Sequence, residues 1–523
     1  MKTSIFKVLA FSFMIAIFSF ASAQEKSVTD KIIEIGKSDN KTMQHLDVLT
    51  NRIGGRILGS DAYENATYWA AGLFKKWGLE VEIQEAGELS VGFNRGPWFG
   101  RMLSEDGMSL HFATPSYTSG TKGVQRGHVV AEPKTKADFE RMKGKLKGAW
   151  VLITGENDGW PIDYSEYADT LRSQIIQENL QISKYNDSIS RINRENANKP
   201  ENKNKPQIAK KELKDAPALF YKEMRDAGIL GIIQSSSVPI RALYDRKNIE
   251  YMTWDELPTC PDIKLDENQY KIIAQKVKER QYFQLEFDIR NNFKPGPVKY
   301  HNVIGIIRGT EFPDEYVMSG GHLDAFDVAT GGVDCGTGVA PNLEAARMIM
   351  AAGGKPRRSI VFCLWAGEEF GLWGSKFWVE SHKDMLDKIS NYFNRDGGPT
   401  VANSLSVPPA MFEDFKKATE QLNSINPDFP FTLTVRQEAR PKPTTAGGSD
   451  HAHFAINGVP TISFGTADPK GYDFNYGEIW HTERDTYNLS IPEYMEHSST
   501  VMAIVLYNLA NQDKMLSRKG LYK

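Results

Sequence analysis

Two adjacent glutamates, Glu368 and Glu369, end an apolar run in "SIVFCLWAGEEFGLWGSKFW". Like charges side by side at the end of a buried segment repel each other and lose hydration, so a nearby cation would stabilise them. Similar groups follow other apolar runs. They are His322 and Asp324 after "EYVMSGG", Asp334 in "GGVDCGTGVA", Asp396 after "ISNYFN", and His481 in "GEIWHTERDT".

Two imidazoles and several carboxylates form a donor set that suits zinc, with manganese or cobalt as alternatives. A pair of zinc ions roughly 3.5 to 4 Å apart needs a bridging carboxylate and end ligands that leave a position open for water. Five of these side chains satisfy that count. A sixth side chain, a carboxylate that binds no metal, can take the proton of the water. The pattern predicts a two-zinc hydrolytic centre.

Each group has a plainer interpretation when it is taken alone. A His-x-Asp or Glu-Glu pair is usually a solvated surface feature. Asp396 stands before two glycines and could be a turn or N-cap residue, and a lone His481 would most often be a satisfied histidine. A shared site is favoured because all these groups fall at predicted strand ends or in adjoining loops, with glycines that let the backbone approach.

Strand and helix patterns alternate from Asn302 onward, through "NVIGIIRG", "VAPNLEAARMIMAAG" and "RSIVFCLWAGEE" to a closing helix, "PEYMEHSSTVMAIVLYNLANQ". Such alternation predicts an α/β fold with a mostly parallel sheet flanked by helices on both faces. Ligands gather at the carboxyl ends of the strands in such sheets. Upstream, the pattern is mainly helical, and one helix is expected to begin at the N-cap Ser60 and to end at Gly78.

Composition excludes several classes of protein. The 523 residues carry a net charge of -3 with acids and bases intermixed, which gives no electrostatic footprint for nucleic acid. Three cysteines, Cys260, Cys335 and Cys363, form at most one bridge, and no CxxC pair is present, so a disulfide scaffold is excluded.

The first residues have the pattern of a signal peptide. Lys2 and Lys7 precede an apolar block and the small residues 21–23. The block is short for a membrane span, which needs roughly 20 residues, so a signal peptide is favoured over an anchor. We expect an exported protein, periplasmic or secreted, with no integral membrane segment after signal removal.

Longer motifs carry a family resemblance. The segments "GGHLDAFDVATGGVDCGTGVA", "WAGEEFGLWGS", "NRDGG", "GGSDHAHFAINGVP" and "WHTERDT" resemble the motif series of the co-catalytic zinc exopeptidases, which include bacterial aminopeptidases and carboxypeptidase Q. The earlier "LTNRIGGRILGSDAYENATYWAAGLFKKWGLEV" is closest to the carboxypeptidase Q branch. A stretch with "LKGAWVLITG" and "MRDAGILGIIQ" resembles a protease-associated domain. The resemblance implies a zinc aminopeptidase-like fold, with a mostly parallel mixed sheet and a smaller, β-rich inserted domain.

The expected domain division follows from these segments. It is a signal peptide (1–23), the N-terminal part of the peptidase domain (24–122), a protease-associated insert (123–290) and the zinc peptidase catalytic domain (291–523). A polar helical insertion at about 164–213 carries an approximately heptad apolar series, Leu171, Ile175, Ile182, Tyr185, Ile189 and Ile192. A solvated amphipathic helix is favoured over an arm that covers the active site or pairs with a partner.

The resemblance also implies a role for each site residue. His322 and Asp396 would bind one zinc, Glu369 and His481 the other, and Asp334 both. Glu368 would be the general base, and Asp324 would accept the second N–H of His322 and hold its tautomer.

Four positions stay open. Asp450 or Asp485 could orient His481 in the same way. Cys335 stands where relatives usually carry an acid or an amide, and a small buried thiol is favoured over a ligand or an oxidation target. Trp480 stands where some relatives carry a tyrosine, so the partner of the oxyanion is not assigned.

The predicted reaction is hydrolysis of dipeptides or short peptides, with dipeptidase action favoured over aminopeptidase or carboxypeptidase action. Arg440, Lys442, His451 and His453 could form a carboxylate pocket or be merely solvated. The alternatives are a glutaminyl cyclase, which uses one zinc, and a non-catalytic binding protein on a peptidase scaffold. A serine hydrolase is excluded, because the consecutive residues 449–451 cannot form a triad and no GxSxG is present. A homodimer is left open.

Overall fold

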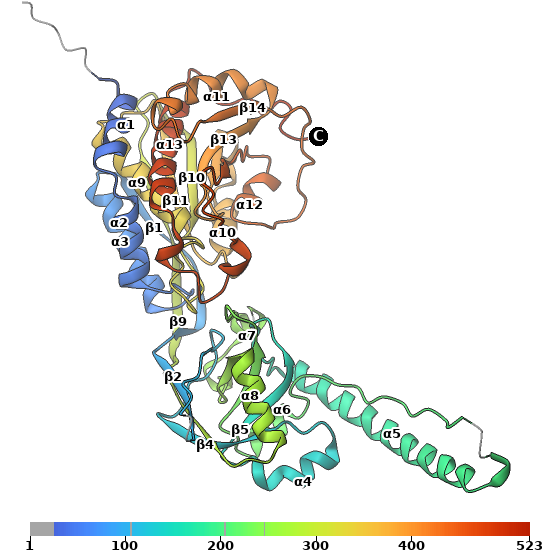
Figure 1. Cartoon of the computed structure of the whole chain (residues 1–523). Coiled ribbons are helices and arrows are strands. Elements are labelled where there is room, and N and C mark those ends of the chain that lie inside the picture. The colour runs from blue at the N-terminus through green and yellow to red at the C-terminus, as the bar shows by residue number, and fades with distance from the viewer. Residues whose placement is uncertain (1–25, 105–106, 203–205, 245) are drawn as a thin grey trace, which may run out of the picture.

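The computed structural model describes residues 26–104, 107–202, 206–244 and 246–523. The chain forms an upper lobe from its N- and C-terminal parts and a lower lobe from its middle part, residues 98–289 (Figure 1). The predicted signal peptide lies outside the described residues. Among the residues described, no helix has both the length and the apolar character needed to cross a membrane.

A mixed sheet forms the centre of the upper lobe. Its described strands lie in the order β1 (Glu80–Asn94), β9 (Asn292–Ile307), β11 (Arg358–Trp365), β10 (Phe312–His322) and β12 (Ile389–Asn394). Strand β10 runs parallel to both β11 and β12, whereas β9 pairs antiparallel with β1 and β11. Strand β11 is buried along its whole length, as its continuous apolar run predicts for a strand covered on both faces.

Alternate side chains of the strands enter separate cores on the two faces of this sheet. Val317 and Phe362 pack in one core, with α3 (Asp61–Lys76), α9 (Gly336–Ala351) and α13 (Pro492–Ala510). Their neighbours Met318 and Cys363 pack in the other, with α10 (Trp373–Ser381) and α12 (His451–Ile456). The predicted α/β class, with a mixed sheet flanked by helices, is confirmed.

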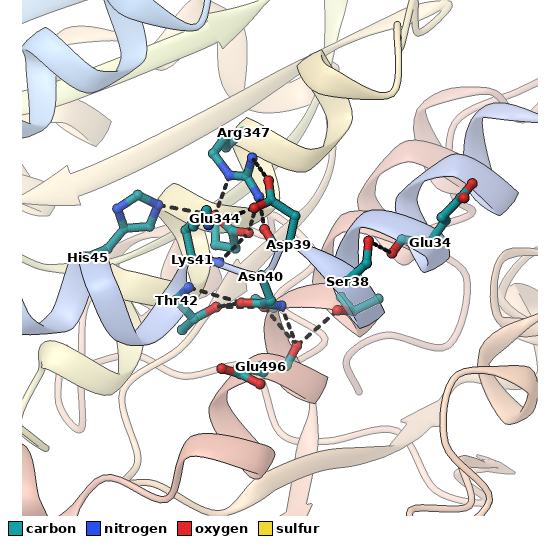
Figure 2. Close-up of polar contacts among 12 residues, drawn as sticks. Glu34, Ser38, Asp39, Asn40, Lys41, Thr42, His45, Glu344, Arg347 and Glu496 are labelled. Atoms are coloured by element: carbon teal, nitrogen blue, oxygen red, sulfur yellow. Dashed lines mark hydrogen bonds and ion pairs between the residues drawn. The ribbon is translucent and has the colours of Figure 1, made fainter.

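The N-terminal helices are attached to the central helices by polar contacts. Helix α1 (Val28–Ser38) begins at a capping box, in which the Ser27 hydroxyl accepts from the Asp30 N–H and the Asp30 carboxylate accepts from the Ser27 N–H. Figure 2 shows the junction with α2 (Thr42–Asp47), where the Lys41 N–H donates to Glu344 at 2.9 Å and Arg347 donates to the Asp39 carbonyl at 2.5 Å. These bonds fix α9, whose first residues adjoin the predicted site.

A small sheet and one further helix complete the described part of the upper lobe. Its strands lie in the order β14 (Thr432–Val435), β13 (Val401–Val407) and β15 (Gly465–Ala467), beside α11 (Phe412–Thr419). The expected helix with the Ser60 cap is confirmed as α3, where the Ser60 hydroxyl accepts from the Tyr63 N–H.

The lower lobe is built on a second mixed sheet. Its described strands lie in the order β2 (Trp98–Leu103), β8 (Gln284–Ile289), β4 (Gln125–Ala131), β5 (Ala149–Glu156), β6 (Gly231–Ser236), β7 (Asp262–Asp266) and β3 (Phe112–Ala113). Its helices are α4 (Lys136–Leu146), α5 (Glu166–Ala197), α6 (Tyr221–Asp226) and α8 (Glu267–Lys278), whereas α7 (Arg246–Tyr251) contacts strand β1 of the upper lobe. Strands β2 and β3 belong to this sheet, although they precede residue 123, where the inserted domain is predicted to begin. The predicted domain boundaries stay a prediction.

Helix α5 projects from the lower lobe as a long arm, and the following chain returns beside it (Figure 1). Asn179, Asn186 and Asn193 each hydrogen-bond to the backbone of the returning segment. Each side chain donates its amide N–H to a carbonyl and accepts from the N–H of the same residue, which is Lys214, Lys211 and Ile208 in turn. The predicted amphipathic helix is therefore present, and its asparagines hydrogen-bond the returning chain along its length.

Helix α13 contains an imidazole whose burial makes stability depend on pH. His497 is 5 % exposed and packs edge-on against Phe429, with ring centroids 5.1 Å apart. Neither ring nitrogen has a hydrogen-bond partner among the described residues. Burial lowers the pKa of His497 to about 4. Because the unfolded imidazole has an ordinary pKa near 6.5, the unfolded chain gains a proton first as the pH falls.

We therefore expect His497 to reduce the free energy of unfolding by about 2 kcal/mol between pH 7 and pH 5. The His497→Phe variant keeps the ring and loses the titration, so its free energy of unfolding falls less over this range. Urea unfolding of both proteins at several pH values measures the difference. Equal pH slopes for the two proteins would contradict this assignment.

Candidate metal centre

Three neighbouring strands deliver polar side chains to the same edge of the upper sheet. Strand β10 ends at His322, which lies in register with Trp365 at the end of β11. Glu368 and Glu369 follow β11, and Asp396 follows β12. This is the carboxyl edge of the parallel strands, where ligands bind in open α/β sheets.

Asp334 lies between the two imidazoles and turns one carboxylate oxygen towards each. Its Oδ1 is 3.1 Å from His322 Nε2, and its Oδ2 is 3.5 Å from His481 Nε2. On the outer sides, His322 Nε2 is 3.5 Å from Asp396 Oδ1, and His481 Nε2 is 3.0 Å from Glu369 Oε2. The structure thus brings together the five residues that the sequence suggested as ligands.

The cluster carries more negative charge than a buried site tolerates without a cation. His322 is 1 % exposed and Asp334 is 5 % exposed. Burial raises the pKa of Glu369 to about 7, and its Oε1 has no hydrogen-bond partner within the described chain. Burial alone would lower the pKa of His481, but the Glu369 carboxylate and a hydrogen bond that His481 donates to the Asp334 carboxylate outweigh it and raise that pKa to about 9.

These observations fit a bound metal. Donor atoms of His322, Asp334 and Glu369 lie within 4.8 Å of one another. Imidazole nitrogens and carboxylate oxygens suit zinc, and the unpaired Glu369 oxygen is available as a ligand. A divalent ion would neutralise charge that protons must otherwise compensate.

Asp324 orients the site through both its main chain and its side chain. Its carbonyl accepts a hydrogen bond from His322 Nδ1 at 2.9 Å, whereas its carboxylate lies 3.7 Å from that nitrogen. The carboxylate instead accepts from the backbone N–H groups of Glu368, at 3.1 Å, and Glu369, at 3.2 Å. Because Nδ1 donates its proton to the carbonyl, the Nε2 lone pair faces the cluster. The tautomer is therefore held by an atom other than the expected carboxylate.

Asp485 supports Asp334. Its Oδ1 accepts from the backbone N–H of Val333 at 2.6 Å and of Asp334 at 3.2 Å. Burial raises the pKa of Asp485 to about 7 and that of Asp450, the other residue considered for His481, to about 8. Asp485 thus fixes the loop that presents the Asp334 carboxylate.

Arg56 is a functional residue that the sequence analysis missed. It is fully buried and donates to the carbonyls of Leu323 and Thr330, both at 2.8 Å. These carbonyls belong to the chain segment between His322 and Asp334. Burial lowers the pKa of Arg56 to about 10, so the guanidinium stays charged at neutral pH and offsets the carboxylates. Its only sequence signal was its place beside two glycines in "NRIGGRILGS".

Cys335 is buried beside the cluster. Its thiol donates to the Arg395 carbonyl at 3.3 Å, and a Cβ added at Gly338 would come within 2.4 Å of its Sγ. Burial raises the pKa of Cys335 to about 12, which keeps the sulfur protonated. The same sulfur lies within 4.8 Å of donor atoms of His322 and Asp396. The packing against glycine supports the small buried thiol over a ligand.

Aromatic rings surround His481, whereas two of the basic residues that the sequence suggested for a carboxylate pocket are exposed. The His481 ring stacks on Trp480 with centroids 3.8 Å apart and contacts Phe326 at 4.1 Å. Arg440 and Lys442 are exposed, as expected for solvated side chains. Burial and then the carboxylates of Asp334 and Asp396 raise the pKa of Tyr476, a neutral phenol that the sequence analysis did not single out.

The fold is that of the zinc aminopeptidases. A peptidase M28 precursor from Shewanella amazonensis superposes with a TM-score of 0.55 at 19% identity, covering 94% of this chain and 97% of that one. A zinc aminopeptidase from Bacillus subtilis superposes with a TM-score of 0.51 at 16% identity, covering 93% and 98%. At these identities the likeness concerns the fold alone.

Residues 302–505 match the sequence model of peptidase family M28. A probable glutamate carboxypeptidase from Arabidopsis thaliana is 32% identical over 231 residues, or 41% of this chain and 33% of the relative. Carboxypeptidase Q from Mus musculus is 30% identical over 219 residues, or 42% and 43%. The chain thus matches less than half the length of these relatives. The predicted family resemblance is confirmed.

Proposed function

We propose that the protein is an exported zinc metallo-exopeptidase that hydrolyses dipeptides or short peptides. The observation that carries the proposal is the Asp334 carboxylate, which turns one oxygen towards each of two imidazoles. A carboxylate that is shared in this way is the ligand that a pair of metal ions requires. The family match and the names of the relatives support peptide hydrolysis.

The residues present fit two zinc ions. His322 and Asp396 would hold one, Glu369 and His481 the other, and Asp334 both. When bound, zinc acts as a Lewis acid and lowers the pKa of a water ligand towards about 7. The export part of the proposal rests on the leader pattern in residues 1–23.

Glu368 is the proton carrier in this proposal. Burial, reinforced by the neighbouring Glu369 charge, raises its pKa well above the ordinary value, although the nearby His322 opposes the shift. A carboxylate with a raised pKa accepts a proton from water more readily and returns it to the leaving amine. The Asp324 carboxylate holds the Glu368 backbone N–H at 3.1 Å and so fixes the start of this turn.

An exopeptidase must recognise a free chain end. Aminopeptidase or carboxypeptidase action predicts hydrolysis of a tripeptide that is free at both ends, and loss of this activity when the end that the protein recognises is blocked. Mass spectrometry of the products from the free, N-acetylated and C-amidated tripeptides distinguishes aminopeptidase from carboxypeptidase action. Dipeptidase action instead predicts cleavage of dipeptides and not of any tripeptide. Cleavage of a tripeptide that is both N-acetylated and C-amidated would contradict an exopeptidase.

Metal removal should abolish hydrolysis. We expect dialysis against a chelator to reduce turnover to background, and added zinc to restore it, because the clustered carboxylates of the five proposed ligands depend on the ion for charge balance. Metal content measured in the same samples links the two effects. Full activity in a sample with no measurable metal would refute the zinc mechanism.

The two adjacent glutamates should respond differently to substitution. Glu368→Gln is expected to keep zinc and to lower kcat by at least about 100-fold, because the amide cannot accept the proton. Glu369→Gln is the matched control and should lose zinc affinity instead. Metal content and steady-state kinetics of both variants test this division. The reverse result would mean that the two roles are exchanged.

A further inference from the structure

The backbone of His481 has an unusual conformation. Its φ is 58°, in the left-handed region that side chains other than glycine seldom adopt. Such a conformation persists where surrounding contacts over-determine it. The Thr482 hydroxyl donates to the Glu478 carbonyl at 2.8 Å, but the loop needs attachment to the rest of the molecule as well.

The lower lobe supplies that attachment. Residues 240–244, which follow strand β6, reach the upper lobe, where Ile240 and Tyr244 are buried in its core. Glu483 donates its backbone N–H to the Ile240 carbonyl at 2.9 Å and accepts from the Ile240 N–H through its Oε1 at 2.9 Å. Beside it, Thr482 and Arg241 form an isolated antiparallel bridge. The residues just after His481 are thus paired with the lower lobe.

The second oxygen of Glu483 meets an imidazole of the lower lobe. His111 Nε2 lies 2.7 Å from Glu483 Oε2. His111 is itself fixed, because its N–H donates to Gln269 Oε1 at 2.7 Å and its carbonyl accepts from the Asp266 N–H at 2.9 Å. Asp266 ends β7 and caps α8 through its side chain. Glu483 is therefore bonded through one oxygen to Ile240 and through the other to His111, both of which belong to the chain segment that forms the lower lobe.

The other end of the loop is attached to the upper lobe. The Asp485 carbonyl accepts from Thr330 at 3.1 Å and from Gly332 at 3.3 Å. His481 therefore belongs to a segment that is held from both lobes, with Glu483 as the contact to the lower one. If the side-chain contacts of Glu483 are lost, the loop keeps its Asp485 end, its internal bonds and its backbone pairing with Ile240 and Arg241, but loses its bond to His111.

We propose that Glu483 is a positioning residue through which the lower lobe, by way of His111 and Ile240, holds His481 at the metal centre. The inference rests on the proposed function, because it requires that His481 binds zinc. It assigns the lower lobe a part in metal binding, and it predicts that a change on that lobe weakens the zinc site without touching any ligand.

The test measures zinc binding rather than turnover. Zinc affinity is determined by competition with a chromophoric chelator for the wild-type protein, Glu483→Ala and His111→Ala. Both variants should lose at least about tenfold in affinity for the zinc that His481 would bind, since partners of metal ligands typically contribute that much. Hydrogen exchange at residues 478–485 should increase, while exchange in β10 and β11 stays slow and reports an intact fold.

Two controls separate the proposal from general damage. Glu478→Gln breaks an ion pair with Arg484 inside the same loop and should leave zinc affinity unchanged. His111→Gln keeps a donor for Glu483 and should restore most of the affinity that His111→Ala loses. If Glu483→Ala fails to fold, the His111 variants decide the question.

Wild-type zinc affinity in His111→Ala, or equal losses in Glu478→Gln and Glu483→Ala, would overturn the proposal. The zinc content and the activity of the wild-type protein test the proposed function separately. A wild-type protein that binds no zinc removes the basis of both, whereas one that binds two ions and cleaves no peptide refutes only the hydrolytic function.

Discussion

The mutual repulsion of buried carboxylates is the constraint around which this upper lobe is organised. Asp334 and Glu369 share a cluster with His322, and Asp396 lies 3.5 Å from the same imidazole. The chain responds with two imidazoles and with the charged guanidinium of Arg56 behind the loops. Burying like charges is tolerated only where opposite charge is close, so the placement of each surrounding group follows from the need to compensate them.

Backbone groups carry much of this support. The Asp324 carboxylate accepts from two consecutive N–H groups, and its carbonyl fixes the tautomer of His322. Asp485 accepts from two more N–H groups beside Asp334. Bonds to the main chain allow little rotamer freedom, so the predicted ligands are pre-positioned before an ion binds. Such pre-organisation concentrates strain at positions such as His481.

The sequence predicted the strand ends and the order of the site groups, because both depend on local patterns. An apolar run such as "VFCLWAG" marks a buried strand, and the polar residue after it marks the edge. The supporting contacts depend on distant parts of the chain. Arg56 bonds to a carbonyl 267 residues away, and His111 meets Glu483 across 372 residues. The Asp324 carbonyl was missed for another reason, since every residue has one and residue type does not reveal its use.

The arm of the lower lobe has a length that can change only in fixed steps. Its asparagines recur every seven residues on the helix, while their backbone partners recur every three on the return. Seven helical residues rise about 10.5 Å, and three extended residues span roughly 9 to 10 Å, so the two repeats advance together. Evolution can therefore lengthen or shorten this arm by ten residues at a time, seven outward and three back. A single inserted residue would instead move every later asparagine off its partner, whereas the bonds on the returning segment are made by its backbone.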